Sequence, residues 1–218
     1  MKVKKVIFFF FVFLPLPAVL ISLQFLPEQI PAHFDLSGQV TRWGSKYETL
    51  LFPILALAFG LFLWAMIRYA AKQEAQGKNN QSISLTASIF CLLLLNVLTG
   101  YALFTSFRQS ETLSFHPLDL YQIESALAGI FLLLIGNKMP KLRYNSVIGL
   151  RTPWSMKNQT TWKKCQRFGG ISFLVAGILM AVSAFLIKGY LCLFVTLGIL
   201  LLSTVISTVY SFRVSKKY

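Results

Sequence analysis

The sequence predicts an all-α membrane protein built as a bundle of six transmembrane helices. Of its 218 residues, 56% are hydrophobic and only 13% are charged, whereas a soluble domain carries about 25% charged residues. Twenty phenylalanines and long uncharged apolar runs account for this composition. These observations exclude a soluble enzyme and a disordered chain.

Six segments are long enough to cross a bilayer, because a transmembrane helix needs about 20 apolar residues. They span residues 6–26, 49–67, 83–107, 118–136, 169–187 and 189–212. The first segment, preceded by three lysines, could alternatively be a cleaved signal peptide. Its long apolar run and the lack of a small-residue cleavage site after Leu26 favour a retained helix. Lys188-Gly189 leaves almost no loop between the last two segments, which predicts a tight helical hairpin.

The net charge of +14 would suggest nucleic-acid binding in a soluble protein. In a membrane protein, basic residues collect in the cytoplasmic segments. With residue 1 inside, 17 of the 21 Lys and Arg fall in the inner segments 1–5, 68–82, 137–168 and 213–218. The charge therefore predicts that both termini are cytoplasmic and that the protein does not bind nucleic acid directly.

The outer loop, residues 27–48, is too patterned to be a simple connector. Pro27 and Pro31 stop the first helix, and Gly38 permits a turn. The spacing of the apolar residues around these positions predicts a short strand or turn folded back on the membrane surface. Trp43 is typical of an interfacial anchor.

Two residues of this loop, His33 and Asp35, would point to one side of an extended chain. Together with His116 and Asp119 in the next outer loop they could form a metal site. Such dispersed ligands are common by chance, so we favour a solvated or hydrogen-bonded histidine and predict no metal. Cys91, Cys165 and Cys192 match neither a metal-binding nor a disulfide spacing, and we interpret all three as free thiols.

The inner loop, residues 137–168, holds eight basic residues and no acidic one. Thr152 as N-cap and Pro153 at the first position predict a helix over 153–167 that leads into the fifth membrane segment. Such a helix would place Trp162 and Cys165 on its apolar face and lie at the membrane interface. Arg151 could bind a carboxylate or phosphate bidentately, or alternatively contact lipid headgroups or a helix end.

Standard catalytic motifs are absent, since the chain has no HExxH, GxxxxGK[ST] or GxSxG sequence. The sequence therefore predicts a protein that is not an enzyme and that needs no cofactor. Glu124 is the ionisable residue that lies well inside an apolar segment, and Asn96 is a polar residue within another. Intramembrane carboxylates are functional by default, so a transporter or lipid-modifying protein that uses Glu124 is an alternative function. Glu124 could instead form only a structural hydrogen bond.

Both loops resemble known families. The outer segment resembles a small domain of unknown function that follows the first helix of many bacterial membrane proteins. The inner segment, containing GNKMPK and GLRTPW, resembles the SdpI family. The matching outer positions are Leu26, Pro27, Ile30, Pro31, His33, Phe34, Gly38, Trp43, Gly44 and Lys46; the inner ones are Gly136, Asn137, Met139, Pro140, Asn145, Gly149, Arg151, Thr152, Pro153, Trp154, Trp162, Arg167, Phe168 and Gly169.

The resemblance implies an immunity protein of the bacterial cytoplasmic membrane, surrounded by lipid, that protects against a secreted peptide toxin of the sporulation-delaying type. It implies toxin contact at the outer-loop residues, including Asp35, and recruitment of a cytoplasmic DNA-binding repressor at the inner loop. A membrane anchor that only recruits a cytoplasmic protein is a further alternative. The motifs divide the chain into residues 1–67, with the outer loop, and residues 83–218, an SdpI-like region with the inner loop.

Overall fold

The structure, a computed structural model, describes residues 1–72, 78–112 and 119–218. Within these residues, six helical spans are long and apolar enough to cross a membrane. The predicted all-α, six-span architecture is confirmed. The spans are Lys2–Ser22, Lys46–Tyr69, Asn80–Arg108, Leu120–Lys141, Gln159–Leu186 and Gly189–Ser215.

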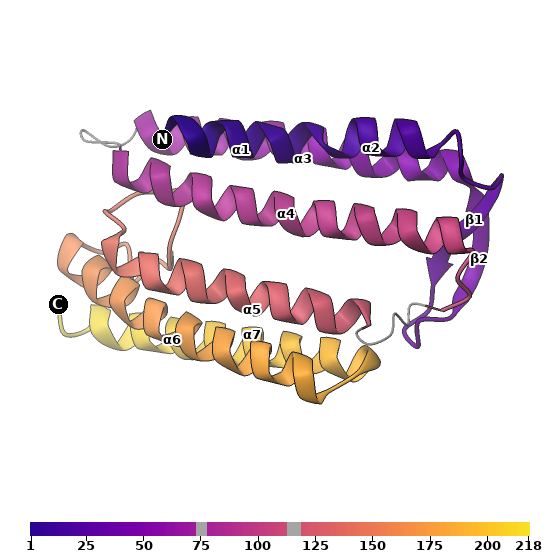
Figure 1. The fold of residues 1–218 in the computed structure, drawn as a ribbon. Coiled ribbons are helices and arrows are strands. Elements are labelled where there is room, and N and C mark those ends of the chain that lie inside the picture. The colour runs from indigo at the N-terminus through magenta and orange to yellow at the C-terminus, as the bar shows by residue number, and fades with distance from the viewer. Residues whose placement is uncertain (73–77, 113–118) are drawn as a thin grey trace.

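The helices run along one common axis and form two layers (Figure 1). One layer contains the helices of the N-terminal half and the other contains those of the C-terminal half, with α4 facing α5. Both chain ends lie at one end of the bundle, and the β-hairpin lies at the opposite end. The helices are α1 (Lys2–Phe13), α2 (Pro15–Ser22), α3 (Leu51–Lys72), α4 (Lys78–Arg108), α5 (Leu120–Lys138), α6 (Gln159–Leu186) and α7 (Gly189–Ser215).

The first span is divided into α1 and α2 by Pro15. Proline has no backbone N–H, so the carbonyl of Phe11 lacks its usual donor four residues ahead. Asn96 of α4 replaces that donor: its Nδ2 atom lies 2.9 Å from the Phe11 oxygen and 2.8 Å from the Leu92 oxygen. The polar side chain predicted inside the membrane therefore joins α4 to α1.

The closest helix pair is α5 with α6, and four glycines permit it. Gly129 and Gly136 face Gly177 and Gly170 in antiparallel order. A Cβ atom on Gly136 would lie 2.7 Å from the Gly170 oxygen, and one on Gly177 would lie 2.7 Å from the Gly129 oxygen. Small residues let membrane helices approach until their backbones touch. These glycines permit such contact at two heights along the helix pair, at Gly136–Gly170 and at Gly129–Gly177.

The outer end of this layer is held by Asp119, the N-cap of α5. Its carboxylate accepts the backbone N–H of Gln122, and the Gln122 side chain accepts the N–H of Asp119, which completes a capping box. The same carboxylate accepts the N–H of Gly189, where α7 begins. Gly189 has φ +63°, which confirms the tight hairpin predicted between the last two spans.

The prediction for the start of the fifth span was wrong. Asn158, not Thr152, is the N-cap of α6, and its side chain accepts the Thr161 N–H at 2.8 Å. Thr152 instead closes a turn by accepting the N–H of Ser155, and the fixed φ of Pro153 suits this turn as well as a helix. The helix then continues to Leu186 without a separate interfacial segment.

The outer loop forms an antiparallel hairpin of β1 (Gln29–Phe34) and β2 (Val40–Ser45), followed by a 3₁₀ turn, η1 (Lys46–Leu50). This confirms the predicted strand. Its register shifts after Pro31, where proline cannot donate to the ladder. Ile30 is buried with Leu26, Val19 and Leu103, so the hairpin is fixed to the helix ends beneath it.

Candidate functional site

The part of the inner loop that joins α5 to α6, residues 139–158, is folded around Asn145. The Asn145 side chain accepts the backbone N–H groups of Val147 and Ile148, both at 2.8 Å. Its amide nitrogen donates to the Arg143 oxygen at 2.7 Å and to the Ile148 oxygen at 3.2 Å. Since the residue is buried, its amide satisfies the backbone of a tight turn. This family-motif position therefore has a folding role.

Gly149 and Gln166 form the second fixed point of the loop. The Gln166 amide pairs with Leu150 in both directions, accepting its N–H and donating to its oxygen, each at 3.0 Å. Gly149 has φ +116°, and a Cβ atom there would lie 2.6 Å from Gln166 Oε1. Glycine is thus required both for the backbone conformation and for the close approach of Gln166.

A small apolar core lies beneath the loop. Trp162 of α6 is 1% exposed and packs with Met139, Leu142 and Ile83. Its indole N–H donates to the Leu142 oxygen at 3.0 Å, which satisfies the polar end of a buried tryptophan. Trp162 and Cys165 share the buried face, as predicted.

The loop is also tied to the end of α7. Thr152 Oγ1 lies 2.8 Å from Ser211 Oγ, and the Trp154 ring meets Phe212 edge to face at 5.2 Å. Further along the loop, the side chains of Lys157 and Asn158 donate to the backbone oxygens of Ser215 and Tyr218, at 2.8 and 3.0 Å.

A contact with the other layer completes the loop. Asn80 of α4 is fully buried and donates to the Arg143 oxygen at 3.2 Å, while accepting the Arg143 N–H at 3.1 Å. The loop thereby joins α4, α6 and α7 at the inner end of the bundle. Sequence reasoning missed this residue together with Gln166 and Asn158; side-chain amides beside helix ends were the available signal.

A second group of motif residues faces outward. Arg151 in the loop and Arg167 on α6 are exposed, with no partner among the residues that the structure describes. Lys163, also on α6, is exposed as well. Trp154 is 38% exposed, and Asn137, Pro140 and Pro153 are exposed as well. The motif therefore divides into a buried group that folds the loop and an exposed, basic group that is free to meet lipid or a partner.

At the opposite end, Asp35 organises the hairpin turn. Its carboxylate accepts the Ser37 hydroxyl at 2.6 Å and the Gln39 N–H at 2.9 Å. These bonds, the Ser37 hydroxyl first, lower the pKa of the Asp35 carboxyl below its ordinary value. Gly38 has φ +81°, so this predicted turn glycine sits where the backbone requires it.

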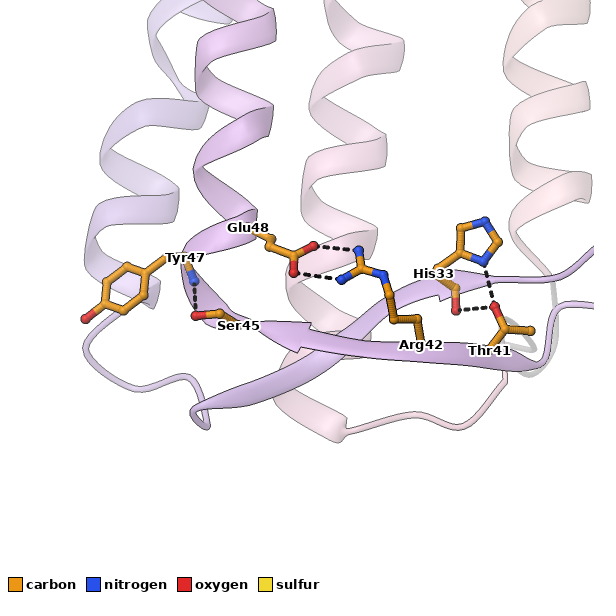
Figure 2. A network of polar contacts seen from close by, with 6 residues as sticks. All are labelled: His33, Thr41, Arg42, Ser45, Tyr47 and Glu48. Carbon is orange, nitrogen blue, oxygen red and sulfur yellow. Dashed lines mark hydrogen bonds and ion pairs between the residues drawn. The ribbon is translucent and has the colours of Figure 1, made fainter.

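A polar network fixes the two strands to η1 (Figure 2). Arg42 makes a bidentate ion pair with Glu48, at 2.9 and 2.7 Å. His33 Nδ1 lies 2.6 Å from Thr41 Oγ1, which confirms the hydrogen-bonded interpretation of this histidine. The Ser45 side chain caps η1 by accepting the N–H of Tyr47.

The proposed metal ligands do not converge within the described residues. No group of three or more His, Cys, Asp or Glu suited to a metal occurs there. Asp35 is used in its turn and Asp119 in the cap of α5, whereas His116 lies outside the described residues. At the base of the hairpin, Lys46 pairs with Glu28 at 2.8 Å, and Trp43 is 42% exposed.

Among the described residues, two adjoining cavities lie in the half of the bundle next to the hairpin. The first, about 380 Å³, lies under the hairpin and is mainly apolar, with the Arg42–Glu48 pair in its wall. The second, about 230 Å³, lies between α4, α5 and α7 and contains Glu124. Leu98 of α4 lines both cavities, so they adjoin at this side chain.

Comparison with known proteins agrees with this architecture. Residues 141–211 match the SdpI/YfhL protein family, and residues 10–57 match a domain of unknown function, DUF1648. The chain is 29% identical over 214 residues to Immunity protein SdpI of Bacillus subtilis (strain 168), covering 98% of this chain and 97% of that protein. No solved structure gives a significant match. The chain is therefore a multi-pass membrane protein that is similar to Immunity protein SdpI along nearly its whole length and that matches the SdpI/YfhL family over residues 141–211.

Proposed function

We propose that the protein is a non-enzymatic immunity protein of the bacterial cytoplasmic membrane that protects its cell against a secreted peptide toxin. The observation that carries this proposal is the similarity to Immunity protein SdpI along nearly the whole of both chains. A likeness limited to one loop would support only a shared motif. Here both patterned loops and all six spans fall inside the aligned length.

The cavity under the hairpin is the proposed contact site for the toxin. Ile30 and Phe34 of β1, Phe52 of α3 and Leu98 of α4 give it an apolar wall, and an apolar wall suits an apolar side chain of a peptide. The Arg42–Glu48 pair beside it offers hydrogen-bonding groups to the peptide backbone.

Expression in a strain sensitive to a sporulation-delaying-type toxin tests the proposal. We expect survival to rise with the wild-type protein and to fall again with Ala102→Phe, which fills the cavity from α4. Ala65→Phe, on the exposed face of α3, is the matched control and retains protection. If the wild-type protein is present in the membrane and survival is unchanged, immunity to that toxin is excluded.

The proposed orientation places the hairpin outside and both termini in the cytoplasm. It rests on the basic bias of the segments at the end that holds the termini. An impermeant maleimide should label Gln39→Cys in intact cells, and Lys217→Cys only after lysis. The reverse labelling pattern would show that the protein is inserted in the opposite orientation.

The exposed basic group of the inner loop favours a second role, recruitment of a cytoplasmic repressor. Arg151, Lys163 and Arg167 present positive charge with no described partner, and guanidinium groups bind carboxylates bidentately. Arg151→Glu with Lys163→Glu should abolish co-purification of a repressor and leave toxin protection intact. Loss of protection as well would show that the two faces are coupled.

A further inference from the structure

Glu124 of α5 lines a second cavity beside the one under the hairpin. The cavity lies between the two layers, with Leu94 and Val97 on α4, Tyr121 and Glu124 on α5, and Thr196 on α7. Its volume of about 230 Å³ holds roughly seven groups of the size of a water molecule. That is close to the size of one extended amino-acid side chain.

The half-buried Glu124 carboxyl has no partner among the residues that the structure describes, whereas the other polar groups around this cavity are paired. Ser125 Oγ and Thr196 Oγ1 lie 2.6 Å apart, and the Tyr121 hydroxyl donates to the Leu36 oxygen at 3.3 Å. Among the described residues, the ion pairs join Arg42 to Glu48 and Lys46 to Glu28. No described residue hydrogen-bonds or pairs with the Glu124 carboxyl.

An unpaired carboxyl group inside a membrane helix is costly, and such groups are kept where a ligand or a pathway uses them. A carboxylate in an apolar cavity is complementary to a cation that brings hydrogen-bond donors, and a primary ammonium supplies three. The remaining lining suits an alkyl chain. Apolar contacts come from Leu94, Val97, Leu98, Leu127, Ala128 and Leu193.

The position of the cavity favours a peptide over a lipid as the source of this ammonium. Glu124 lies five residues beyond the α5 N-cap, Asp119, and therefore about 7 Å deeper along the helix. The headgroup amine of an aminophospholipid lies at the membrane surface, above this level. A peptide seated under the hairpin reaches the Glu124 cavity past Leu98, which lines both spaces.

Building on the proposed function, we propose that the Glu124 cavity binds a primary ammonium group, a lysine side chain or an N-terminal amine, carried by the peptide toxin. The carboxylate forms a charge-assisted hydrogen bond with the ammonium, and the apolar walls cover its alkyl chain. The hairpin cavity receives a neighbouring apolar side chain of the same peptide.

A labelling experiment tests the cavity without the toxin. Dicyclohexylcarbodiimide reacts with carboxyl groups in apolar surroundings: the acid adds across one C=N bond, and the acyl group then moves to nitrogen, giving a stable N-acylurea. The full chain is placed in nanodiscs of phosphatidylcholine, and labelling at Glu124 is followed by peptide mass spectrometry. Glu124→Gln removes this label, and Glu111→Gln, the same change at an exposed carboxyl, leaves it unchanged.

The probe is an acetylated, amidated leucine pentapeptide with one central lysine, compared with the same peptide carrying norleucine. We expect the lysine peptide to lower Glu124 labelling at a concentration at least about tenfold below that needed with norleucine, since a hydrogen bond to a charged group is strong. Equal effects of the two peptides would overturn the proposal. Protection by nanodiscs containing phosphatidylethanolamine alone would also overturn it, because the occupant would then be lipid.

The toxin assay separates this inference from the proposed function. If the inference is correct, Glu124→Gln loses protection and Glu111→Gln retains it. Full protection by Glu124→Gln overturns the inference and leaves the immunity proposal standing. If even the wild-type protein fails to protect, the proposed function fails, and the assignment of a toxin as the source of the ammonium fails with it.

Discussion

Asn96 on α4 donates a hydrogen bond to the carbonyl oxygen of Phe11, the acceptor that Pro15 leaves without a partner. We expect Asn96→Ala to lower the free energy of unfolding by about 1–2 kcal/mol, because an unpaired carbonyl remains inside the membrane. Pro15→Ala restores the missing N–H. In that background Asn96→Ala should cost clearly less, and unfolding in detergent micelles measures the double-mutant cycle. Strict additivity would show that Asn96 does not compensate for Pro15.

The glycine contacts between α5 and α6 predict a steric effect. Gly136→Ala places a methyl group against the Gly170 backbone, which forces the helices apart and should cost about 1–3 kcal/mol of unfolding free energy. Gly100→Ala is the matched control, since no atom lies within 4 Å of a Cβ there, and alanine has the higher helix propensity. Equal unfolding curves for the two variants would contradict the close α5–α6 packing.

Gly149 is expected to be intolerant of substitution for two reasons, its positive φ and its contact with Gln166. Gly149→Ala should release the Leu150 amide, so that it exchanges with deuterium much faster. Gln166→Ala should have the same local effect because it removes the same hydrogen bond. Gly198→Ala, in open space on α7, should leave the exchange of Leu150 unchanged.

The hairpin turn should loosen in acid. The hydrogen bonds of Asp35 lower its pKa in the folded protein, so they favour the turn fully above the ordinary value of about 3.9. This contribution is lost as the pH falls through the lowered pKa, when the carboxylate is protonated. As the pH falls over that range, the rate of amide exchange at Gln39, divided by its intrinsic rate, should rise in the wild-type protein. In Asp35→Asn this ratio should not change with pH.

The sequence alone was sufficient for the number and kind of membrane spans. Apolar length predicted the six spans, and the spacing of apolar residues between the prolines and glycines predicted a short strand or turn where the structure has a two-stranded hairpin. The start of α6 was misplaced because Thr152-Pro153 suits a turn as well as a helix. Asn158, the actual cap, satisfies the same local rule, and which of the two begins the helix depends on the contacts of the loop with α7.

The site was less accessible to sequence reasoning. Family-motif residues such as Asn145 and Trp162 were expected either to contact partners or to have a structural role, and both are buried and hydrogen-bonded within the protein. The same loop is held by hydrogen bonds between Gln166 and Leu150 and between Asn80 and Arg143. These partners are far apart in the sequence, so the sequence does not reveal that they pair. The glycine register of α5 and α6 is likewise a relation between two helices, which neither helix reveals by itself.

The links between the inner loop and residues 211–218 also constrain how the protein is made. Thr152, Lys157 and Asn158 bond to Ser211, Ser215 and Tyr218, which follow them in the chain by 58–60 positions and therefore leave the ribosome after them. The N-terminal layer and its hairpin can insert and pack earlier. The inner loop therefore reaches its folded state only after α7 has been synthesised, and a chain interrupted within α7 would leave this basic loop open.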